Sequence, residues 1–565
     1  MVDDLGWNGF SLQGNNNEVK NPTMEKLAQD AVLLENYYVY KFCSPSRAAF
    51  LTGRVPGHGI WEINPGNAAE VGVNLKATMI SAMLKNRAGY STHQIGKWHQ
   101  GFYAPEYTPR GRGFDTSFGF LMGGADHFNQ CRACANSIAP PDYTNHSQTC
   151  SVKDSCNVTC PEQGGVDLYR DDGPAFGENG TAYSSYLWSR EAERIIDANH
   201  GSIPMFMYLA LHNVHQPVEA PPEFLNHFPA EDYNETETSR RYYNAMTFSV
   251  DQVIANVTNA LKRNGMYENT VMVISTDNGG TYEHYHGPKS PVTGSSNFPL
   301  RGYKYSYFEG GIRGFGMIHS PLLPNWRRGT KSKILLHITD FYTTFCKLAG
   351  LNDCSDEFSD APLDGVDAWS LLLDNKDDNV KRPASGWASH GGPGEDEVML
   401  GVGHGISGAL RKGDMKIIVG GVPRQTDGWS AQYPGLTEKR PPPTKDVSCK
   451  ERPCLFNITA DPSEEHDLAD GNPTLVAELL NRYKELAAAM SIDDIEGRDK
   501  YKDLIWDGAY HVPRVIDAEA CERMKQTGFW APWKSHPNNP DKKIFTHEFP
   551  DDGPESRFNE ETLLI

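Results

Sequence analysis

This chain has no run of about 18 consecutive apolar residues, and by the usual length criterion that absence excludes a membrane-spanning helix. Positive charge is also in short supply. The 53 lysines and arginines are outnumbered by 73 aspartates and glutamates, which gives a formal net charge of −20. Nucleic acids and anionic membrane surfaces attract basic proteins, so neither is expected as a general partner of so acidic a chain.

A secretory leader is also missing from the start of the sequence. The chain opens Met1-Val2-Asp3-Asp4, where a signal peptide would carry a basic segment followed by an apolar core. Two interpretations follow. Either the natural N-terminus is truncated in this sequence, or the protein is a cytosolic one that needs no leader.

The cysteines favour the first interpretation. Eleven cysteines are many for a cytosolic protein, and setting Cys43 aside leaves ten, an even number that can form five disulfides. Cys131-x-x-Cys134 could supply half of a zinc site, but no second pair of cysteines or histidines follows at zinc spacing, so disulfides are favoured. We expect Cys521 to tie the C-terminal tail back to the large domain.

Glycosylation triplets point to the same compartment. Asn-x-Ser/Thr sequons mark glycosylation sites in secreted proteins. Six occur, at Asn145, Asn157, Asn179, Asn234, Asn256 and Asn457. Together with the cysteines they predict a glycoprotein of the secretory pathway, either lysosomal or extracellular.

Length and composition predict two domains. A chain of 565 residues exceeds what one hydrophobic core usually organises. Charged residues, proline and glycine become frequent between residues 375 and 397, which marks a boundary. We therefore expect a large domain over residues 1–385 with a polar, cysteine-rich insertion at about 123–181, and a smaller domain over residues 386–565.

Apolar periodicity predicts an α/β fold for the large domain. Continuous apolar runs at 204–211 and 271–275 are typical of strands buried on both faces of a parallel sheet. They alternate with amphipathic stretches typical of helices. The other expected segments are strands at 32–39 and 90–95, helices at 22–29, 77–87, 183–198 and 238–264, a strand followed by a helix at 334–350, and, in the smaller domain, strands at 398–403, 408–411 and 415–419 and a helix at 473–490.

One stretch has the composition of a reactive site. Residues 41–54 read KFCSPSRAAFLTGR. Cys43 stands at a turn that Pro45 is expected to force, and Arg47 beside it can bind an oxyanion with two hydrogen bonds. The stretch therefore predicts a potential nucleophile next to an anion-binding cation.

Two acidic turns predict a metal ion. Asp3 and Asp4 are adjacent carboxylates at the end of a short strand, and holding two such charges together calls for a cation. Asp277 and Asn278 follow the apolar run at 271–275, and the glycines after them let the backbone turn sharply. Because all of these ligand atoms are oxygens, they suit a hard divalent cation. We expect one Ca²⁺ ion rather than Mg²⁺.

Basic residues follow expected strands in the same way. Lys97 and His99 are two positions apart, so in an extended segment both side chains point to one face. The apolar run at 204–211 leads in the same way to two histidines, His212 and His215. Open α/β sheets place their sites at the carboxyl ends of their strands, so we expect these side chains to converge.

The motifs that carry these residues resemble the signatures of the sulfatase family. The matches are C-x-P-S-R and L-T-G-R at 43–54, D-D-L-G-W at 3–7, G-K-W-H-x-G at 96–101, x-x-x-H-x-P ending at 217, T-D-N-G-G at 276–280 and L-R-G-x-K at 300–304. The resemblance covers most of the chain. It implies an alkaline-phosphatase-like α/β domain, with a mostly parallel sheet flanked by helices, and a small C-terminal α+β domain with an antiparallel sheet and a packed helix.

The resemblance also implies a role for each residue. In this family the signature cysteine is oxidised to formylglycine during biosynthesis by the formylglycine-generating enzyme, and its hydrated aldehyde attacks sulfur. The implied ligands of Ca²⁺ are Asp3, Asp4, Asp277, Asn278 and the formylglycine at Cys43. Arg47 supports the hydrate, and Asp277 helps to deprotonate the attacking hydroxyl. The implied sulfate-binding residues are Lys97, His215 and Lys304, and either His215 or Lys304 donates a proton to the leaving alcohol. His99 regenerates the aldehyde. The pattern selects His215, so His212 is expected to be structural or to line the cleft.

The substrate class follows from the same resemblance. The segments W-E-I at 61–63, G-G-A-D-H-F at 123–128 and V-H-Q-P-V-E-A-P at 214–221 are most similar to the arylsulfatase B group, the N-acetylgalactosamine-4-sulfatases. The insertion from Cys131 onward departs from that group, and substrate choice resides in such loops. We expect hydrolysis of sulfate monoesters on a sulfated carbohydrate, with the sugar and linkage open.

Three alternatives stay open at this point. The chain could be a phosphodiesterase or phosphonate hydrolase of the same superfamily. It could be a non-catalytic glycan-binding relative, although nothing compels a binding module to keep a nucleophile beside a metal site. It could also be a cytosolic protein in which Cys43 is a free thiol.

Overall fold

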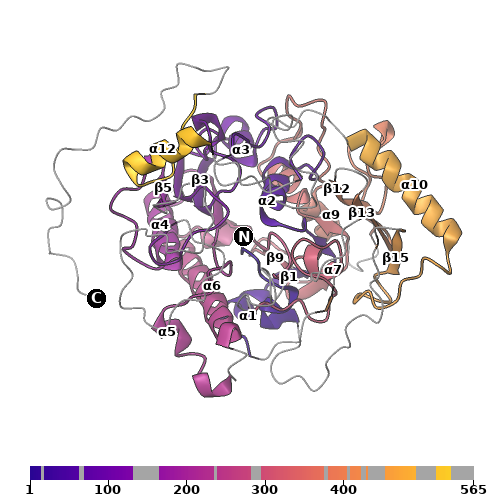
Figure 1. The fold of residues 1–565 in the computed structure, drawn as a ribbon, viewed down its shortest axis with the longest axis horizontal. Helices are drawn as coiled ribbons and strands as arrows, with labels where there is room; N and C mark the ends of the chain where they lie inside the picture. The colour runs from indigo at the N-terminus through magenta and orange to yellow at the C-terminus, as the bar shows by residue number, and fades with distance from the viewer. Residues whose placement is uncertain are drawn as a thin grey trace.

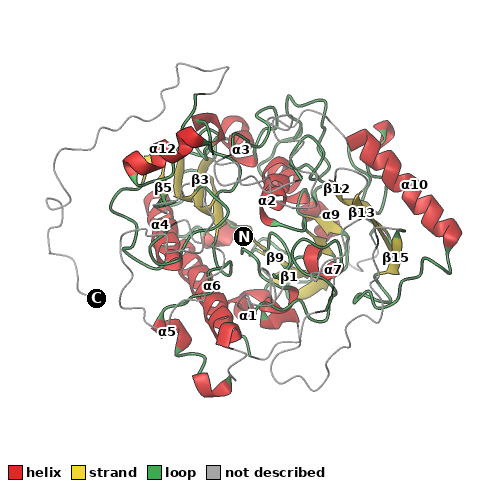
Figure 2. Cartoon of the chain, in the orientation of Figure 1, coloured by secondary structure: helices red, strands yellow, loops and turns green. Residues whose placement is uncertain are grey.

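The computed structural model describes residues 1–13, 18–62, 69–131, 165–233, 238–281, 294–374, 380–403, 407–420, 428–429, 449, 452–490 and 517–535. A central system of strands lies between two layers of helices (Figure 2). Most of these central strands belong to two sheets, and the N-terminus lies near the centre of the molecule (Figure 1).

The first of these sheets has four strands in the order β10-β1-β9-β8. β1 pairs in parallel with β10 and antiparallel with β9, which in turn pairs antiparallel with β8. Three strands therefore run in one direction and β9 in the other. The strands are β1 (Ala31–Leu34), β8 (Met272–Ser275), β9 (Gly316–His319) and β10 (Thr330–Ser332).

The second sheet has five strands in the order β6-β5-β4-β3-β7. β3 pairs in parallel with both of its neighbours, so that Ile95 lies opposite Phe118 of β4 and Leu209 of β7. Two short strands add an antiparallel edge. The strands are β3 (Ser91–Lys97), β4 (Thr116–Phe120), β5 (Tyr169–Arg170), β6 (Gly173–Pro174) and β7 (Met205–Ala210). The predicted mostly parallel α/β arrangement is confirmed.

The first residues of the chain join the two sheets. The Val2 amide donates to the Ser275 carbonyl at 2.8 Å, at the end of β8. On the other side the Leu211 amide, just past β7, donates to the Met1 carbonyl at 2.9 Å. This short extended segment delivers Asp3 to the carboxyl ends of both strands.

Helices cover both faces of the strand system. Successive side chains of β1 point to opposite faces of the sheet, and both faces are apolar. Val32 and Leu34 enter the core shared with α2, α3, α8 and α9, whereas Ala31 enters the core shared with α1, α4, α5 and α6. The helices are α1 (Pro22–Ala28), α2 (Cys43–Thr52), α3 (Ile80–Ala88), α4 (Ser184–Asn199), α5 (Pro222–Leu225), α6 (Thr238–Arg263), α7 (Glu309–Ile312), α8 (Asp340–Leu348) and α9 (Ala368–Asp374). Short 3₁₀ turns are Trp7–Gly9, Ser11–Gln13, Pro105–Tyr107, Ala230–Asp232, Tyr267–Asn269 and Ala388–His390.

The C-terminal part has a sheet of its own. Its four strands pair antiparallel in the order β12-β13-β14-β15, and α10 packs on one face through Leu479, Tyr483 and Leu486 (Figure 1). The elements are β12 (Glu397–Gly403), β13 (Ser407–Lys412), β14 (Met415–Val419), β15 (Cys454–Asn457) and α10 (Pro473–Met490). The expected small antiparallel sheet with a packed helix is confirmed, while the exact domain boundary at residue 385 stays a prediction.

Two predicted segments differ in detail from the structure. The expected strand at 32–39 is wrong as one piece: a turn at Glu35 and Asn36 separates β1 from β2 (Tyr37–Tyr38), and β2 pairs with β11 (Leu336–His337) instead. The helix expected from residue 77 begins at Ile80, because Asn74 first holds a turn by accepting the Lys76 amide at 2.9 Å.

Disulfides are present as predicted. Cys346 bonds Cys354 and Cys449 bonds Cys454. Cys131 and Cys521 are also disulfide-bonded, and among the described cysteines only Cys43 is free. The other cysteines, most of the predicted insertion and the sequons at Asn145, Asn157 and Asn234 lie outside the described residues.

The C-terminal tail returns to the large domain through α12 (Ala518–Thr527) and the residues after it. The Trp530 amide donates to the Val166 carbonyl at 2.9 Å, and the Trp533 amide donates to the Tyr103 carbonyl at 3.1 Å. In the described ranges, none of the helices has the length and apolar character needed to cross a bilayer.

Candidate active site

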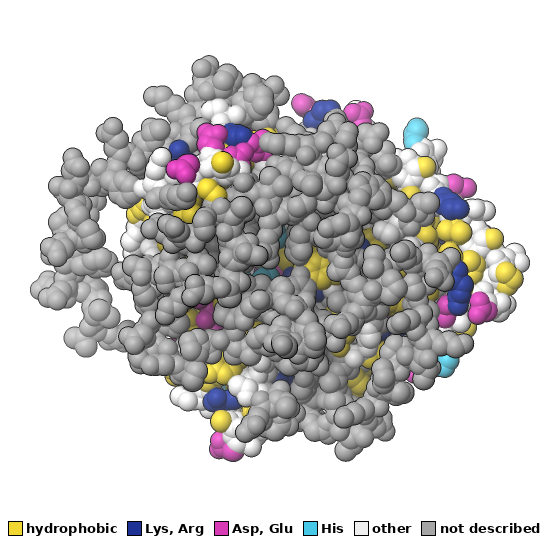
Figure 3. Space-filling view, in the orientation of Figure 1, with side chains coloured by type: hydrophobic (Ala, Val, Ile, Leu, Met, Phe, Trp, Pro, Cys, Tyr) yellow, Lys and Arg dark blue, Asp and Glu magenta, His cyan; other side chains and the backbone are white. Residues whose placement is uncertain are grey.

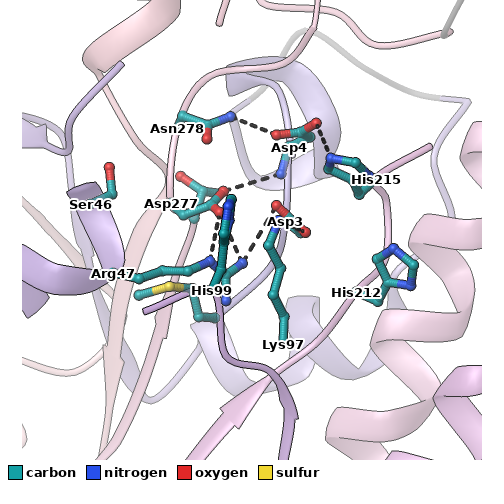
Figure 4. A network of polar contacts seen from close by, with 12 residues as sticks. Asp3, Asp4, Ser46, Arg47, Lys97, His99, His212, His215, Asp277 and Asn278 are labelled. Atoms are coloured by element: carbon teal, nitrogen blue, oxygen red, sulfur yellow. Dashed lines mark hydrogen bonds and ion pairs between the residues drawn. The ribbon is translucent and has the colours of Figure 1, made fainter. Parts of the chain in front are cut away.

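The predicted site residues come together at the carboxyl ends of the central strands (Figure 4). Lys97 ends β3, His215 follows β7, and Asp277 follows β8. On the face seen in Figure 3, histidine and basic side chains are visible near the middle of the molecule, where Figure 1 marks the N-terminus. Strands from both sheets therefore contribute to one buried cluster.

Cys43 is the first residue of α2. The preceding Phe42 is extended, with φ −163° and ψ 169°, and the helix ends at Gly53 in a left-handed conformation. The predicted turn at Pro45 is wrong: Pro45 lies inside the first helical turn, where backbone amides have no intrahelical acceptor and a missing N–H costs little. The signature stretch thus begins a helix and presents residue 43 at its start.

The Cys43 thiol is only 2% exposed. Burial raises its pKa to about 11, although the nearby Lys304 and Lys97 ammonium groups work in the opposite direction. The side chain therefore stays a neutral thiol at physiological pH, which is unlike the activated thiolates of cysteine enzymes.

Arg47 is fully buried and holds two acidic residues. Its Nε and one terminal nitrogen donate to Asp277 Oδ2 at 3.0 and 2.9 Å, and the same terminal nitrogen lies 3.4 Å from Asp3 Oδ1. Its third nitrogen donates to the Tyr208 hydroxyl at 3.5 Å. The guanidinium is thereby fixed in place before any ligand binds.

Asp4 is the most highly connected carboxylate of the cluster. Oδ1 accepts from Lys304 Nζ at 2.6 Å and from Asn278 Nδ2 at 2.8 Å, and Oδ2 lies 3.7 Å from His215 Nε2. Burial opposes its ionisation, but Lys304 and His215 outweigh this effect and hold the pKa of Asp4 well below its ordinary value. Asp4 is therefore ionised throughout the physiological range.

Lys97 and His99 both reach the cluster, but not through an extended segment. β3 ends at Lys97, whose ammonium pairs with Asp3 Oδ2 at 2.7 Å. His99 then adopts a left-handed backbone with φ 55°, so the predicted strand-like alternation is wrong at this position. Its ring is buried, and burial followed by Lys97 holds the pKa of His99 well below its usual value, so the imidazole is neutral.

The carboxylate and amide oxygens of the cluster suit a hard divalent cation, whereas the Cys43 sulfur and the His215 nitrogen that lie near them do not. Single ligand atoms of Asp3, Asp4, Cys43 and His215 lie within 4.8 Å of one another. Within the described part of the chain, Asn278 Oδ1 is buried and accepts no hydrogen bond, as expected of an atom that awaits a ligand. Burial and then Asp3 raise the pKa of Asp277 to about 6. A bound cation would offset both the desolvation of the Asp277 carboxylate and its repulsion from Asp3.

Formal charge supports the same conclusion. The ionised groups of the cluster are three carboxylates, at Asp3, Asp4 and Asp277, and three cations, at Arg47, Lys97 and Lys304. These charges cancel. A divalent cation would therefore leave the cluster with a charge of about +2, which is suited to an anionic ester.

His212 lies beside the site and away from the polar contacts drawn in Figure 4. Its ring stacks on His127 with centroids 4.0 Å apart, and its Nε2 accepts the Ala125 amide at 3.4 Å. The prediction of a structural role agrees with this placement. His127 Nε2 itself donates to the His215 carbonyl at 3.0 Å, a contact that no local pattern in the sequence predicts.

Comparisons with known proteins agree with the arrangement. A family model described as Sulfatase matches residues 1–351. Arylsulfatase J of Mus musculus is 34% identical over 510 residues, which are 86% of this chain and 74% of that enzyme. The N-acetylgalactosamine-6-sulfatase of Mus musculus is 28% identical over 396 residues, and the match spans 66% of this chain and 65% of that enzyme.

A solved structure extends the similarity to the fold. The crystal structure of Ps i-CgsB in complex with k-i-k-neocarrahexaose superposes with a TM-score of 0.65 at 27% sequence identity, covering 88% of this chain and 94% of that chain. The match therefore extends over most of both chains.

Proposed function

The chain belongs to the sulfatase family of sulfuric ester hydrolases, and we propose that it removes sulfate groups from a sulfated carbohydrate with a formylglycine made from Cys43 as its nucleophile. One observation carries the proposal. The Cys43 sulfur lies in a group of ligand atoms, all within 4.8 Å of one another, that includes Asp3 and Asp4. A buried, neutral thiol beside two carboxylates is a poor nucleophile, whereas an oxygen nucleophile next to a hard cation suits this setting.

The metal would be Ca²⁺, held by the oxygens of Asp3, Asp4, Asp277 and Asn278 together with residue 43. When bound, it would supply Lewis-acid stabilisation of negative charge on the ester. Arg47 already bridges Asp3 and Asp277, so the chain itself keeps two of the proposed ligands in register.

Lys97, His215 and Lys304 are proposed to bind the sulfate group. Two of the three are cations anchored on Asp3 and Asp4, so their positions are set before the ester arrives. Asp277 is proposed to help deprotonate the attacking hydroxyl. His99 is neutral and can accept the proton whose removal regenerates the aldehyde.

Two observations favour Lys304 over His215 as the donor to the leaving alcohol. His215 Nδ1 lies 2.7 Å from the Gln216 carbonyl and must donate to it, so a neutral ring has no proton on Nε2, which faces Asp4. Burial lowers the pKa of His215 to about 3. Lys304 keeps its proton, because Asp4 outweighs burial and holds the Lys304 pKa well above its ordinary value, so we assign the donor role to Lys304.

Carbohydrate as the substrate class is supported by the relatives. One is named for a sulfated amino sugar, and a structural neighbour was solved with an oligosaccharide bound. The sugar, the similarity to arylsulfatase B and conversion by the formylglycine-generating enzyme remain parts of the proposal. The disulfides support the expected secretory location, lysosomal or extracellular.

Matched ester substrates test the proposal. An aryl sulfate and the corresponding aryl phosphate are offered to the wild-type protein and to Cys43→Ala, with circular dichroism to verify folding. We expect the sulfate to be hydrolysed at least about 10²-fold faster than the phosphate, and Cys43→Ala to lose at least about 10³-fold in kcat. A preference for phosphate would favour the phosphodiesterase or phosphonate hydrolase alternative, and an inactive but folded wild type would favour a glycan-binding role.

A further inference from the structure

The short helix α7 is the support on which the proposed metal loop lies. The Gly279 amide, next to Asn278, donates to the Gly311 carbonyl at 3.0 Å. The approach is so close that a Cβ on Gly279 would lie 1.7 Å from the Gly310 carbonyl oxygen. Backbone lies directly on backbone here, so a shift of α7 must also shift Asn278.

The same helix supports the segment that carries Lys304. The Gly310 amide donates to the Arg301 carbonyl at 2.5 Å, and a Cβ on Gly310 would lie 2.2 Å from the Gly302 carbonyl oxygen. The Lys304 amide in turn donates to the Gly280 carbonyl at 2.9 Å. α7 therefore fixes the spacing between the metal loop and the Lys304 ammonium.

The C-terminal part of the chain holds α7 through three buried charged residues, which we call the clamp triad. They are Glu309 at the start of α7, Lys416 in β14, and Glu464 in the segment that follows β15. Lys416, in β14, places Nζ 2.7 Å from Glu309 Oε1 and 2.7 Å from Glu464 Oε1. Glu464 Oε2 accepts the Glu309 backbone amide at 2.6 Å. All three side chains are fully buried.

Groups of the large domain complete the surroundings of the triad. Glu309 Oε2 accepts the Tyr38 hydroxyl at 2.7 Å and lies 3.6 Å from Arg313, and Arg411 of β13 donates to the same hydroxyl. Lys416 Nζ also donates to the Tyr307 carbonyl at 3.1 Å. Without Lys416, two buried carboxylates would face each other, and α7 would lose the attraction that holds it to the sheet.

We propose that Lys416 and Glu464 are positioning residues for the sulfatase reaction: they clamp α7 from the C-terminal sheet and so set the geometry of the metal loop and Lys304. Neither side chain touches the cluster around Cys43. The inference rests on the proposed function, because the quantity that it predicts is the calcium affinity of that site. It assigns the C-terminal sheet a part in catalysis in addition to a part in stability.

Calcium binding tests this inference apart from activity. Purified wild-type protein, Lys416→Met, Glu464→Ala and Arg482→Met are freed of metal and titrated with CaCl₂ alone, and the Tm is followed at each concentration. Arg482 is the matched control, because it pairs with Glu397 at 2.8 Å and joins α10 to β12 inside the C-terminal unit. Aryl sulfate kinetics are measured per folded molecule in the same preparations.

We expect calcium affinity to fall by about tenfold or more in Lys416→Met and Glu464→Ala, with a lower kcat, and to stay within about twofold of wild type in Arg482→Met. If the triad variants lose Tm while their calcium affinity and kcat match those of Arg482→Met, the clamp is structural only and the inference is overturned. If Lys416→Met fails to fold, Glu464→Ala decides by the same criteria. If Glu464→Ala also fails to fold, Glu464→Gln replaces it, because the glutamine can still accept the Glu309 amide.

Failure of the inference is distinguishable from failure of the proposed function. If the Tm of the wild type does not respond to calcium, the proposed calcium site is contradicted. The comparison of kcat between the triad variants and Arg482→Met then decides the inference. A wild type that responds, with triad variants that respond equally, contradicts the inference alone.

Discussion

Two clusters of buried charge meet at α7, and they differ in how completely their groups are paired. In the clamp triad each charged group lies within 2.7 Å of an opposite charge. The cluster around Cys43 holds six charged groups that cancel, yet Asn278 Oδ1 is left without a hydrogen bond and His215 is 18% exposed. Glu464 Oε1 also accepts no hydrogen bond, but it is ion-paired with Lys416, whereas Asn278 Oδ1 has no partner among the described residues. Charge that is paired within the protein thus accompanies support, and an unpartnered oxygen accompanies a site built for a ligand.

The largest effect that separates the two clusters is expected from Asn278→Ala. The change removes the amide oxygen that awaits a ligand, so we expect calcium affinity and kcat to fall on the order of 10²-fold, with little loss of metal-free stability. Calcium titration of Tm and aryl sulfate kinetics measure both quantities.

Asn278→Asp is the control, because it keeps an oxygen at the same place and should retain calcium binding. Equal calcium affinity in wild type and Asn278→Ala would show that this oxygen is no ligand. That result would contradict the contrast between the two clusters. A similar loss in both variants would mean that the Asn278 Nδ2 contact to Asp4 matters more than the oxygen.

A smaller effect is expected from the pH dependence of the clamp triad. Burial raises the pKa of Glu464 from its ordinary 4.5 to about 7, in spite of Lys416, while Lys416 and Arg313 hold the pKa of Glu309 below its usual value. Between these two pH values the folded state keeps a proton on Glu464 that the unfolded state loses. The protonation of Glu464 therefore contributes most to stability below pH 4.5, and this contribution falls as pH rises to 7. Glu309 acts in the opposite sense, because the contribution of a carboxyl whose pKa is lowered is lost as pH falls below 4.5.

Glu464→Gln removes this titration. The free energy of unfolding of the variant, relative to wild type, should rise between pH 4.5 and 7, by at most about 3 kcal/mol. Urea unfolding at a series of pH values measures it. Parallel curves for the two proteins would contradict a shifted Glu464 and would make the triad a fixed ion pair at all pH values.

Local patterns in the sequence were sufficient to predict the fold and the gathering of the site. Apolar runs located β7 and β8, and turn residues after β8 located Asp277, because a parallel sheet brings the carboxyl ends of its strands together. The choice of His215 over His212 came from the resemblance to the sulfatase motif. The helix at 473–490 was predicted to the residue.

What the sequence could not predict depends on long-range contacts or on backbone detail. Lys416 and Glu309 are 107 positions apart, and a lysine within a strand has no local mark of burial. The left-handed backbone of His99 is set by packing against Gly123, where a Cβ would lie 2.7 Å from the His99 ring. Pro45 was expected to form a turn, but the N-terminus of a helix accepts proline equally well.

The most direct test of the central claim is the mass of the peptide that contains residue 43. Digestion after Lys41 and Arg47 releases Phe42–Arg47, and a hydrazide reagent distinguishes an aldehyde from a thiol. Active protein made in cells that possess the formylglycine-generating enzyme should yield this peptide with the mass of the aldehyde or its hydrate, and the peptide should react with the hydrazide. A fully active preparation in which the peptide carries only an unmodified thiol would contradict the account.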